Sequence, residues 1–230
     1  MAEATHKTIS LFVTGTDTGV GKTLASAALL HALAKRHLRV VGMKPVAAGT
    51  ASVDGVEANE DVLALRAAST CRVPPELDNP VLLPDPVSPH IAAARAGARI
   101  DIAHLVACHR QLALLADAVV VEGAGGFHVP LSPLETGADL AQALGLPVVL
   151  VVGLRLGCLN HALLTAEAIR ARGLTLAGWV ANHIDPAMLA QDDNIEFLQQ
   201  RLQAPLLASI PWQPGLDARA VTIHLPVEWQ

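Results

Sequence analysis

The sequence predicts one α/β domain, residues 1–230, with a single doubly wound, mostly parallel sheet and helices on both of its faces. Two observations predict this fold. Short apolar runs alternate with helical patterns along most of the chain, which is typical of a parallel sheet covered on both faces. The first run also leads into a glycine-rich turn that precedes a helical pattern. A chain of 230 residues is long enough for one sizeable core.

The expected strands are short, β-branched runs bounded by turn residues, and they cover residues 9–14, 39–46, 118–122, 147–152 and 175–181. The expected helices cover residues 22–36, 59–69, 88–96, 101–116, 137–144, 159–172 and 187–202. Asp101 has the character of an N-cap residue for the helix over 101–116. The proline-rich stretch from Pro74 to Pro89 has no clear periodicity and predicts a surface loop. Residues 222–225 fit either a short edge strand or a segment that covers the core.

Composition excludes several classes of function. Hydrophobic residues make up 52% of the chain, but no apolar run approaches the ~18 residues of a membrane span. The polar start, Met1 to Lys7, does not resemble a signal peptide. With three widely spaced cysteines, this favours a cytoplasmic protein without disulfides or a membrane partner. A net charge of −5 and 3% aromatic residues argue against nucleic-acid binding.

The segment Gly15-Thr16-Asp17-Thr18-Gly19-Val20-Gly21-Lys22-Thr23 predicts a nucleoside-triphosphate site of the P-loop type. Glycines let backbone N–H groups close around phosphate oxygens. Lys22 brings a positive charge to the β and γ phosphates, and the Thr23 hydroxyl can join the shell of a Mg²⁺ ion. Thr16 stands where the strict motif has glycine. An ordinary glycine-rich turn with a surface lysine is disfavoured, because the turn, lysine, hydroxyl and flanking elements all agree.

Three charged residues lie where they can join this site. Glu122 ends an apolar strand and precedes glycines, a position where a carboxylate meets Mg²⁺ in nucleotide-hydrolysing proteins. Lys44 ends the second strand and is expected to point into the same crevice as Lys22, where two cations suit a transferring phosphoryl group. Asp61 lies in the first turn of a helix. Alone, these residues would be interpreted as a strand-end glutamate, a surface lysine and a helix-dipole partner.

Two later segments have weaker signals. A helix begins near Cys158, and its free N–H groups can hold a carboxylate. Cys158 itself fits a small buried residue better than a nucleophile, because no partner is identifiable. Asn182 closes the last expected strand, and its amide can both donate to and accept from a base edge.

These segments occur together and in order with several others, and the set resembles the dethiobiotin synthetase family over about residues 8–213. The matching blocks are Gly15 through Thr23, Lys44-Pro45-Val46, Ser88-Pro89-His90, Val121-Glu122-Gly123-Ala124-Gly125-Gly126, Gly157-Cys158-Leu159-Asn160-His161, Gly178-Trp179-Val180-Ala181-Asn182 and Ile210-Pro211-Trp212. The resemblance implies Mg-ATP-dependent closure of a cyclic urea from 7,8-diaminononanoate and CO₂. The reaction passes through a carbamate and a carbamic–phosphoric anhydride and gives dethiobiotin, ADP and phosphate.

The resemblance also implies roles for individual residues. The family's catalytic lysine matches Lys44, which acts beside Lys22. The nucleotide-binding positions match Gly19, Val20, Gly21, Lys22, Thr23, Leu24, Asp61, Glu122, Gly123, Ala124, Gly125, Asn182, His183, Pro211, Trp212 and Gln213. The metal ligands match Thr23, Asp61 and Glu122. The substrate-binding positions match Thr18, Lys44 and Ala48, together with Gly157, Cys158, Leu159 and Asn160 of the second subunit in a homodimer.

Ala48 departs from the family pattern, because some members have a serine there that contacts the substrate. A backbone or water contact could replace that hydrogen bond.

The main alternative is a dimeric ATPase switch of the partitioning or site-selection type. Such proteins carry a lysine early in the loop, and Asp17 occupies that place here with the opposite charge. A third interpretation, a small-molecule kinase, does not explain the turns after Glu122 and around Cys158.

Overall fold

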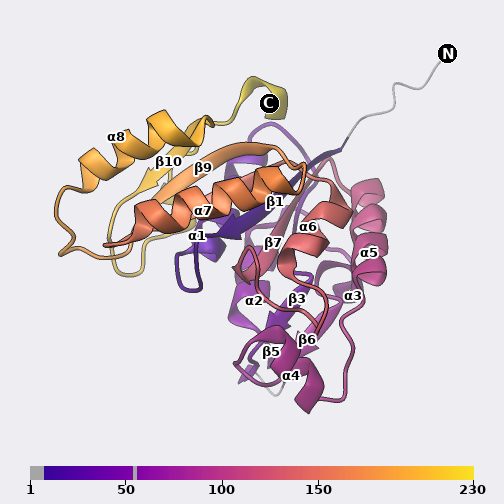
Figure 1. Ribbon diagram of the computed structural model, residues 1–230. Helices are drawn as coiled ribbons and strands as arrows, with labels where there is room; N and C mark the ends of the chain where they lie inside the picture. The colour runs from indigo at the N-terminus through magenta and orange to yellow at the C-terminus, as the bar shows by residue number, and fades with distance from the viewer. Residues whose placement is uncertain (1–7, 54–55) are drawn as a thin grey trace.

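The computed structural model describes residues 8–53 and 56–230 and places a parallel sheet at its centre (Figure 1). Six strands form this sheet in the order β10-β9-β8-β1-β7-β2, and every neighbouring pair is parallel. The strands are β1 (Ile9–Gly15), β2 (Val40–Met43), β7 (Ala118–Gly126), β8 (Val148–Leu154), β9 (Leu176–His183) and β10 (Leu206–Ile210). The expected parallel sheet is therefore confirmed.

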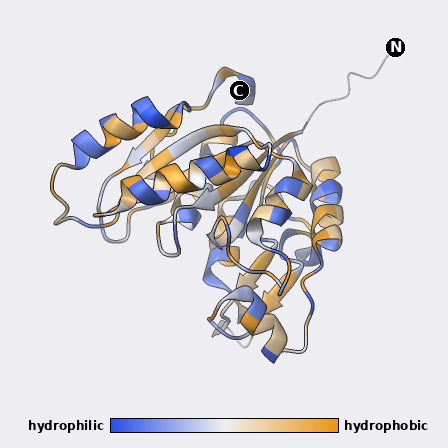
Figure 2. Ribbon diagram, in the orientation of Figure 1, coloured by the Kyte–Doolittle hydropathy of each residue, from blue (hydrophilic) through white to orange (hydrophobic). Residues whose placement is uncertain are grey.

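Helices cover both faces of this sheet, as predicted. The principal helices are α1 (Lys22–Leu33), α2 (Glu60–Ala68), α5 (Ile102–Leu115), α6 (Gly137–Leu144), α7 (Cys158–Ala171) and α8 (Gln191–Leu202). In Figure 1, α6 and α7 lie in front of the sheet and α1 lies behind it. Figure 2 shows hydrophobic residues along the central strands and mixed colours along the outer helices. This is the pattern of amphipathic helices that pack on a buried sheet.

Two apolar layers result from the alternation of side chains along each strand. Phe12 of β1 packs in one layer with residues of α5, α6, α7 and α8. Its neighbours Leu11 and Val13 pack in the other layer with residues of α1 and α2. Trp229, only 4% exposed, also belongs to the second layer.

Local signals define several helix starts. The side chain of Asn59 caps α2 by accepting from the N–H groups of Asp61 and Val62. Asp101 caps α5 in the same way, so the predicted N-cap is confirmed. Helix α1 ends at Leu33 instead of residue 36, and α8 begins at Gln191 instead of residue 187.

The structure corrects the expected strand over residues 39–46. β2 ends at Met43, and the chain continues as a separate strand, β3 (Val46–Ala48). Proline lacks the N–H group that would extend the ladder, so the break falls at Lys44-Pro45. β3 pairs with β6 (Val81–Leu83), and β4 (Ala51–Val53) pairs with β5 (Val56–Ala58).

The prediction of a plain loop over Pro74–Pro89 is wrong. This stretch contains α3 (Pro75–Asp78) and β6, and it leads into α4 (Pro89–Arg95). Proline is favoured in the first turn of a helix, which explains both helix starts. β10 was also not expected from the sequence.

The C-terminal segment covers the core. The N–H of His224 donates to the carbonyl of Leu207 at 2.8 Å, while Ile223 and Leu225 pack against the second apolar layer. Two short 3₁₀ turns, Ala218–Ala220 and Val227–Trp229, belong to this segment. Within residues 8–53 and 56–230, no helix combines the length and apolar character required to cross a bilayer.

Candidate functional site

Four polar side chains meet at the carboxyl ends of the central strands, and we call them the lysine–carboxylate cluster. Lys44 Nζ lies 2.7 Å from Oδ2 of Asp61 and 2.6 Å from Oε1 of Glu122. The Thr23 hydroxyl lies 2.6 Å from Oδ1 of Asp61 and 3.0 Å from Oε1 of Glu122. The cluster therefore joins residues that the sequence placed on four different elements.

Burial strengthens the attraction between the Lys44 ammonium and the two carboxylates of the cluster. Glu122 is fully buried and Lys44 is 4% exposed, whereas the side chain of Asp61 is 41% exposed. Burial alone would lower the pKa of Lys44, but the carboxylates of Glu122 and Asp61 outweigh it and raise that pKa. Burial would likewise raise the pKa of Asp61, but Lys44 lowers it. The site thus holds a persistent ammonium between two carboxylates.

The loop before α1 has the backbone shape that phosphate binding needs. Gly19 and Gly21 have φ values of 73° and 86°, a region that residues with a Cβ rarely adopt. Lys22 Nζ donates to the carbonyl of Asp17 at 3.1 Å. Burial, followed by repulsion from Lys44, lowers the pKa of Lys22 to about 8. The two lysines accordingly share one crevice.

Asn182 lies against this loop. Its Nδ2 donates to the carbonyl of Val20 at 2.9 Å, and the side chain is buried. A Cβ on Gly21 would lie only 2.1 Å from the same nitrogen. The Asn182 amide therefore supports the loop, and in this structure its Nδ2 is already engaged.

The nucleotide-binding positions that the resemblance implies after Asn182 lie at the same edge of the sheet. His183 contacts Gln191 and lies 2.9 Å from the Ser209 hydroxyl. Asn182 pairs with Ile210 in register, which places Pro211 beside the end of β9. Trp212 is 54% exposed, and Gln213 is exposed as well.

A cavity of about 410 Å³ opens beside the cluster. Thr18, Lys44, Ala48 and Asp61 line it, and Ala124 and Gly125 complete the wall next to the loop. The three expected substrate-binding positions of one subunit therefore face the same space. Ala48 presents no hydrogen-bonding group there, as the sequence indicates.

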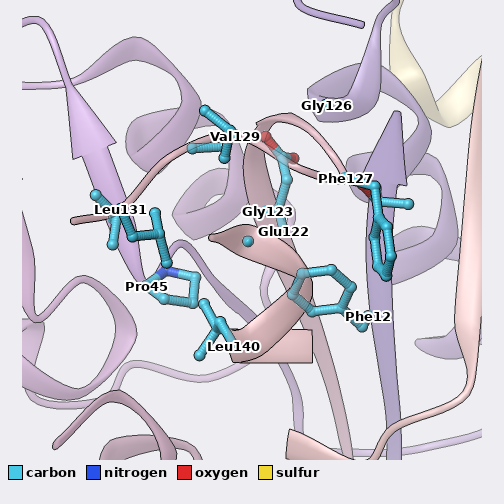
Figure 3. Close-up of a pocket in the computed structure, with 13 residues that line it drawn as sticks. Phe12, Pro45, Glu122, Gly123, Gly126, Phe127, Val129, Leu131 and Leu140 are labelled. Carbon is cyan, nitrogen blue, oxygen red and sulfur yellow. The ribbon is translucent and has the colours of Figure 1, made fainter. Parts of the chain in front are cut away.

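Apolar side chains surround the part of Glu122 that lies below its carboxylate. Figure 3 shows Phe12, Pro45, Leu131 and Leu140 around it, with the carboxylate pointing away from them. Its Oε2 has no hydrogen-bond partner among the described residues. Because a buried carboxylate oxygen is costly without a partner, this atom is available for another ligand.

The oxygens of Thr23, Asp61 and Glu122 fit a Mg²⁺ ion. One hydroxyl and two carboxylates converge at hydrogen-bond distance, and hard oxygen donors are what Mg²⁺ prefers. Oε2 of Glu122, which has no partner within residues 8–53 and 56–230, supports the same interpretation.

The turn at residues 157–160 lies at the start of α7, beside the loop. Gly157 has a φ of 96° and precedes Cys158, which is buried. Leu159 is half-buried and Asn160 is exposed. The ion pair between Arg155 and Asp17 joins this turn to the loop.

Sequence reasoning missed three residues around the site. Asp17 was considered only for its charge, yet its carbonyl holds Lys22 and its carboxylate holds Arg155. Asp78 and Asn79 contact the backbone of Lys44. Both fall in the stretch that was expected to be a loop, where a proline at a helix start was the available signal.

A family model described as an AAA domain matches residues 9–220. The chain belongs to this AAA domain family. The family includes dethiobiotin synthetase.

Among solved structures, the chain is similar to the septum site-determining protein MinD of Pyrococcus horikoshii, determined with Mg-ADP, at 20% identity and a TM-score of 0.56. That alignment covers 90% of this chain and 82% of MinD. It is also similar to the MinC:MinD complex of Aquifex aeolicus, at 19% identity and a TM-score of 0.55, over 90% of this chain and 83% of the other.

The signal recognition particle receptor FtsY of Elizabethkingia anophelis, in complex with GDP, matches at 17% identity and a TM-score of 0.56. The alignment covers the whole of this chain, which spans 64% of the FtsY chain. At these identities the likenesses establish a P-loop NTPase-like fold.

Proposed function

We propose that this protein is a dethiobiotin synthetase, which uses ATP and Mg²⁺ to close a cyclic urea from 7,8-diaminononanoate and CO₂. The observation that carries the proposal is the position of Lys44. Its ammonium lies between two carboxylates and lines a cavity of about 410 Å³ next to the phosphate-binding loop. A cation between nucleotide and cavity suits phosphoryl transfer to a second anion.

The phosphate-binding loop and the two lysines have different roles in this reaction. The loop from Gly19 to Leu24 binds the phosphates through its N–H groups, and Lys22 turns from the carbonyl of Asp17 to the phosphate oxygens. Lys44 stabilises the carbamate that forms on one amine of the substrate and the phosphoryl oxygens that approach it. These two anions would otherwise repel each other.

Thr23, Asp61 and Glu122 would hold the Mg²⁺ ion, which supplies charge neutralisation at the β and γ phosphates. Once the carbamate oxygen carries the phosphoryl group, the second amine attacks the carbonyl carbon and phosphate leaves. Both amines belong to one molecule, so the walls of the cavity need only keep it folded.

The proposal includes a homodimer. The turn from Gly157 to Asn160 of a second copy would hold the substrate carboxylate at the start of its α7. Leu156 and Leu164 beside this turn are 94% and 57% exposed, and apolar side chains of this kind favour a contact with another subunit.

The first test is phosphate release from MgATP and bicarbonate, with and without 7,8-diaminononanoate. We expect release that depends on the diamine, a product with the mass of dethiobiotin, and loss of both in Lys44→Ala. The matched control is Lys35→Ala, at an exposed lysine remote from the cluster. Slow phosphate release at the same rate with and without the diamine would refute the proposed synthetase activity and favour an ATPase switch.

A further inference from the structure

The backbone of Lys44 lies outside the central sheet. β2 ends one residue earlier, at Met43, and Pro45 follows. Because Lys44 is buried, both of its peptide groups need partners. Its N–H donates to the carbonyl of Asp78 at 2.7 Å. Its carbonyl accepts from Nδ2 of Asn79, also at 2.7 Å.

Asn79 joins this backbone to β6 as well. The same Nδ2 lies 3.2 Å from the carbonyl of Val81, and the N–H of Val81 donates to the carbonyl of Pro45. One amide therefore bridges the residue that carries the ammonium and the strand beside it. Without this amide, the buried carbonyl of Lys44 loses its side-chain partner.

A bidentate ion pair holds the segment that contains Asn79. Arg66 Nε and Nη2 lie 2.8 Å and 2.6 Å from the two carboxylate oxygens of Asp78, and Asp78 is buried. Two parallel bonds of this kind fix orientation as well as distance. The pair therefore holds the residue whose carbonyl accepts from Lys44.

The same helix carries a carboxylate of the cluster. Arg66 lies near the end of α2, and Asp61 lies in its first turn. At that first turn, Asn59 accepts from the N–H of Asp61 and donates to the carbonyl of Gly49 at 2.8 Å. Helix α2 is consequently tied at its start to Gly49 and near its end to Asp78, whose carbonyl accepts from the N–H of Lys44.

We propose that Asn79 is a positioning residue, held by the Arg66–Asp78 pair, that fixes the Lys44 ammonium between Asp61 and Glu122. This inference rests on the proposed function only for its effect on turnover. The geometric effect on Lys44 is independent of the substrate.

The kinetic test compares Asn79→Ala and Arg66→Ala with Arg172→Ala. The control breaks an arginine–aspartate pair with Asp139, away from the cluster. We expect kcat for diamine-dependent phosphate release to fall about tenfold or more in Asn79→Ala, and less in Arg66→Ala. KM for MgATP should stay within about twofold. Arg172→Ala should lower Tm and leave kcat unchanged.

A second readout does not depend on the reaction. Nucleotide-free protein is treated with sulfosuccinimidyl acetate, and mass spectrometry measures acetylation of Lys44 relative to exposed Lys35. We expect this ratio to rise about fivefold in Asn79→Ala, because a released ammonium is more accessible. If Asn79→Ala does not fold, Asn79→Ser and Arg66→Lys replace the two alanine variants.

The outcomes separate the two proposals. A folded Asn79→Ala protein with wild-type acetylation at Lys44 and wild-type kcat would overturn the positioning role. Wild-type phosphate release that does not depend on the diamine would overturn the proposed synthetase activity. Increased Lys44 acetylation in Asn79→Ala in the same experiments would still support the positioning role.

Discussion

Replacing Lys44 by methionine should destabilise the protein in the absence of Mg²⁺, because it leaves a buried carboxylate without its counter-ion. Glu122 is fully buried, and among the residues that the structure describes it would keep only the Thr23 hydroxyl at 3.0 Å. Asp61 is 41% exposed, so water can replace its bond to Lys44. Methionine fills similar space, so little cavity cost is added. Breaking a buried pair costs about 3–5 kcal/mol, and the remaining hydroxyl favours the lower figure, about 3 kcal/mol.

The assay is urea unfolding followed by far-UV circular dichroism in EDTA, together with a thermal melt. A loss of about 3 kcal/mol corresponds to a fall in Tm of roughly 6–12 °C for a chain of this size. Adding Glu122→Gln to Lys44→Met should recover at least half of the loss, because the uncompensated charge is gone. Breaking the exposed Arg95–Asp85 pair by Arg95→Met should cost less than about 0.5 kcal/mol. The reasoning fails if Lys44→Met is as stable as wild type, or if the double variant is no more stable than Lys44→Met.

Two further predictions concern pH and the loop. Burial, followed by the charge of Arg110, lowers the pKa of His109 below its ordinary 6.5. The unfolded chain then binds more protons than the folded one around and below that pH, so the free energy of unfolding should fall as the pH drops through this ordinary value. Urea titrations should show a smaller fall in His109→Gln, and an equal fall would contradict the assignment. Gly21→Ala should weaken binding of a fluorescent ATP analogue about tenfold or more, because its Cβ meets Asn182 at 2.1 Å. Gly145→Ala, with φ of 65° but no atom within 4 Å of its Cβ, should cost about 1–2 kcal/mol of stability and leave nucleotide binding intact.

The sequence was sufficient for the parallel sheet and for the elements that carry the cluster. Apolar runs and a glycine-rich turn are local signals, and strands that run parallel bring their carboxyl ends to one edge. Lys44 and Glu122 could therefore be placed together before any contact was known, whereas Asp61, in the first turn of a helix, was placed with them by the family resemblance. Their contacts of 2.6 and 2.7 Å in the structure agree with that expectation.

The missed features depend on contacts between distant segments. Asp78 and Asn79 matter because their carbonyl and amide reach the backbone of Lys44, and no periodicity encodes such a bond. β10 is a short run whose pairing with β9 becomes visible only in three dimensions. The engagement of Asn182 with Val20 is likewise a tertiary contact. A strand-end amide alone does not reveal which partner it takes.

The lysine–carboxylate cluster also determines how a polyphosphate can enter. The ammonium groups of Lys22 and Lys44 face the carboxylates of Asp61 and Glu122, so these four charges cancel. A crevice without net charge exerts little long-range attraction on an anion, and association should vary little with ionic strength. A bare polyphosphate would also meet two carboxylates at close range. A divalent cation held by those carboxylates would free Lys44 for the phosphate, so nucleotide and cation should each strengthen the binding of the other.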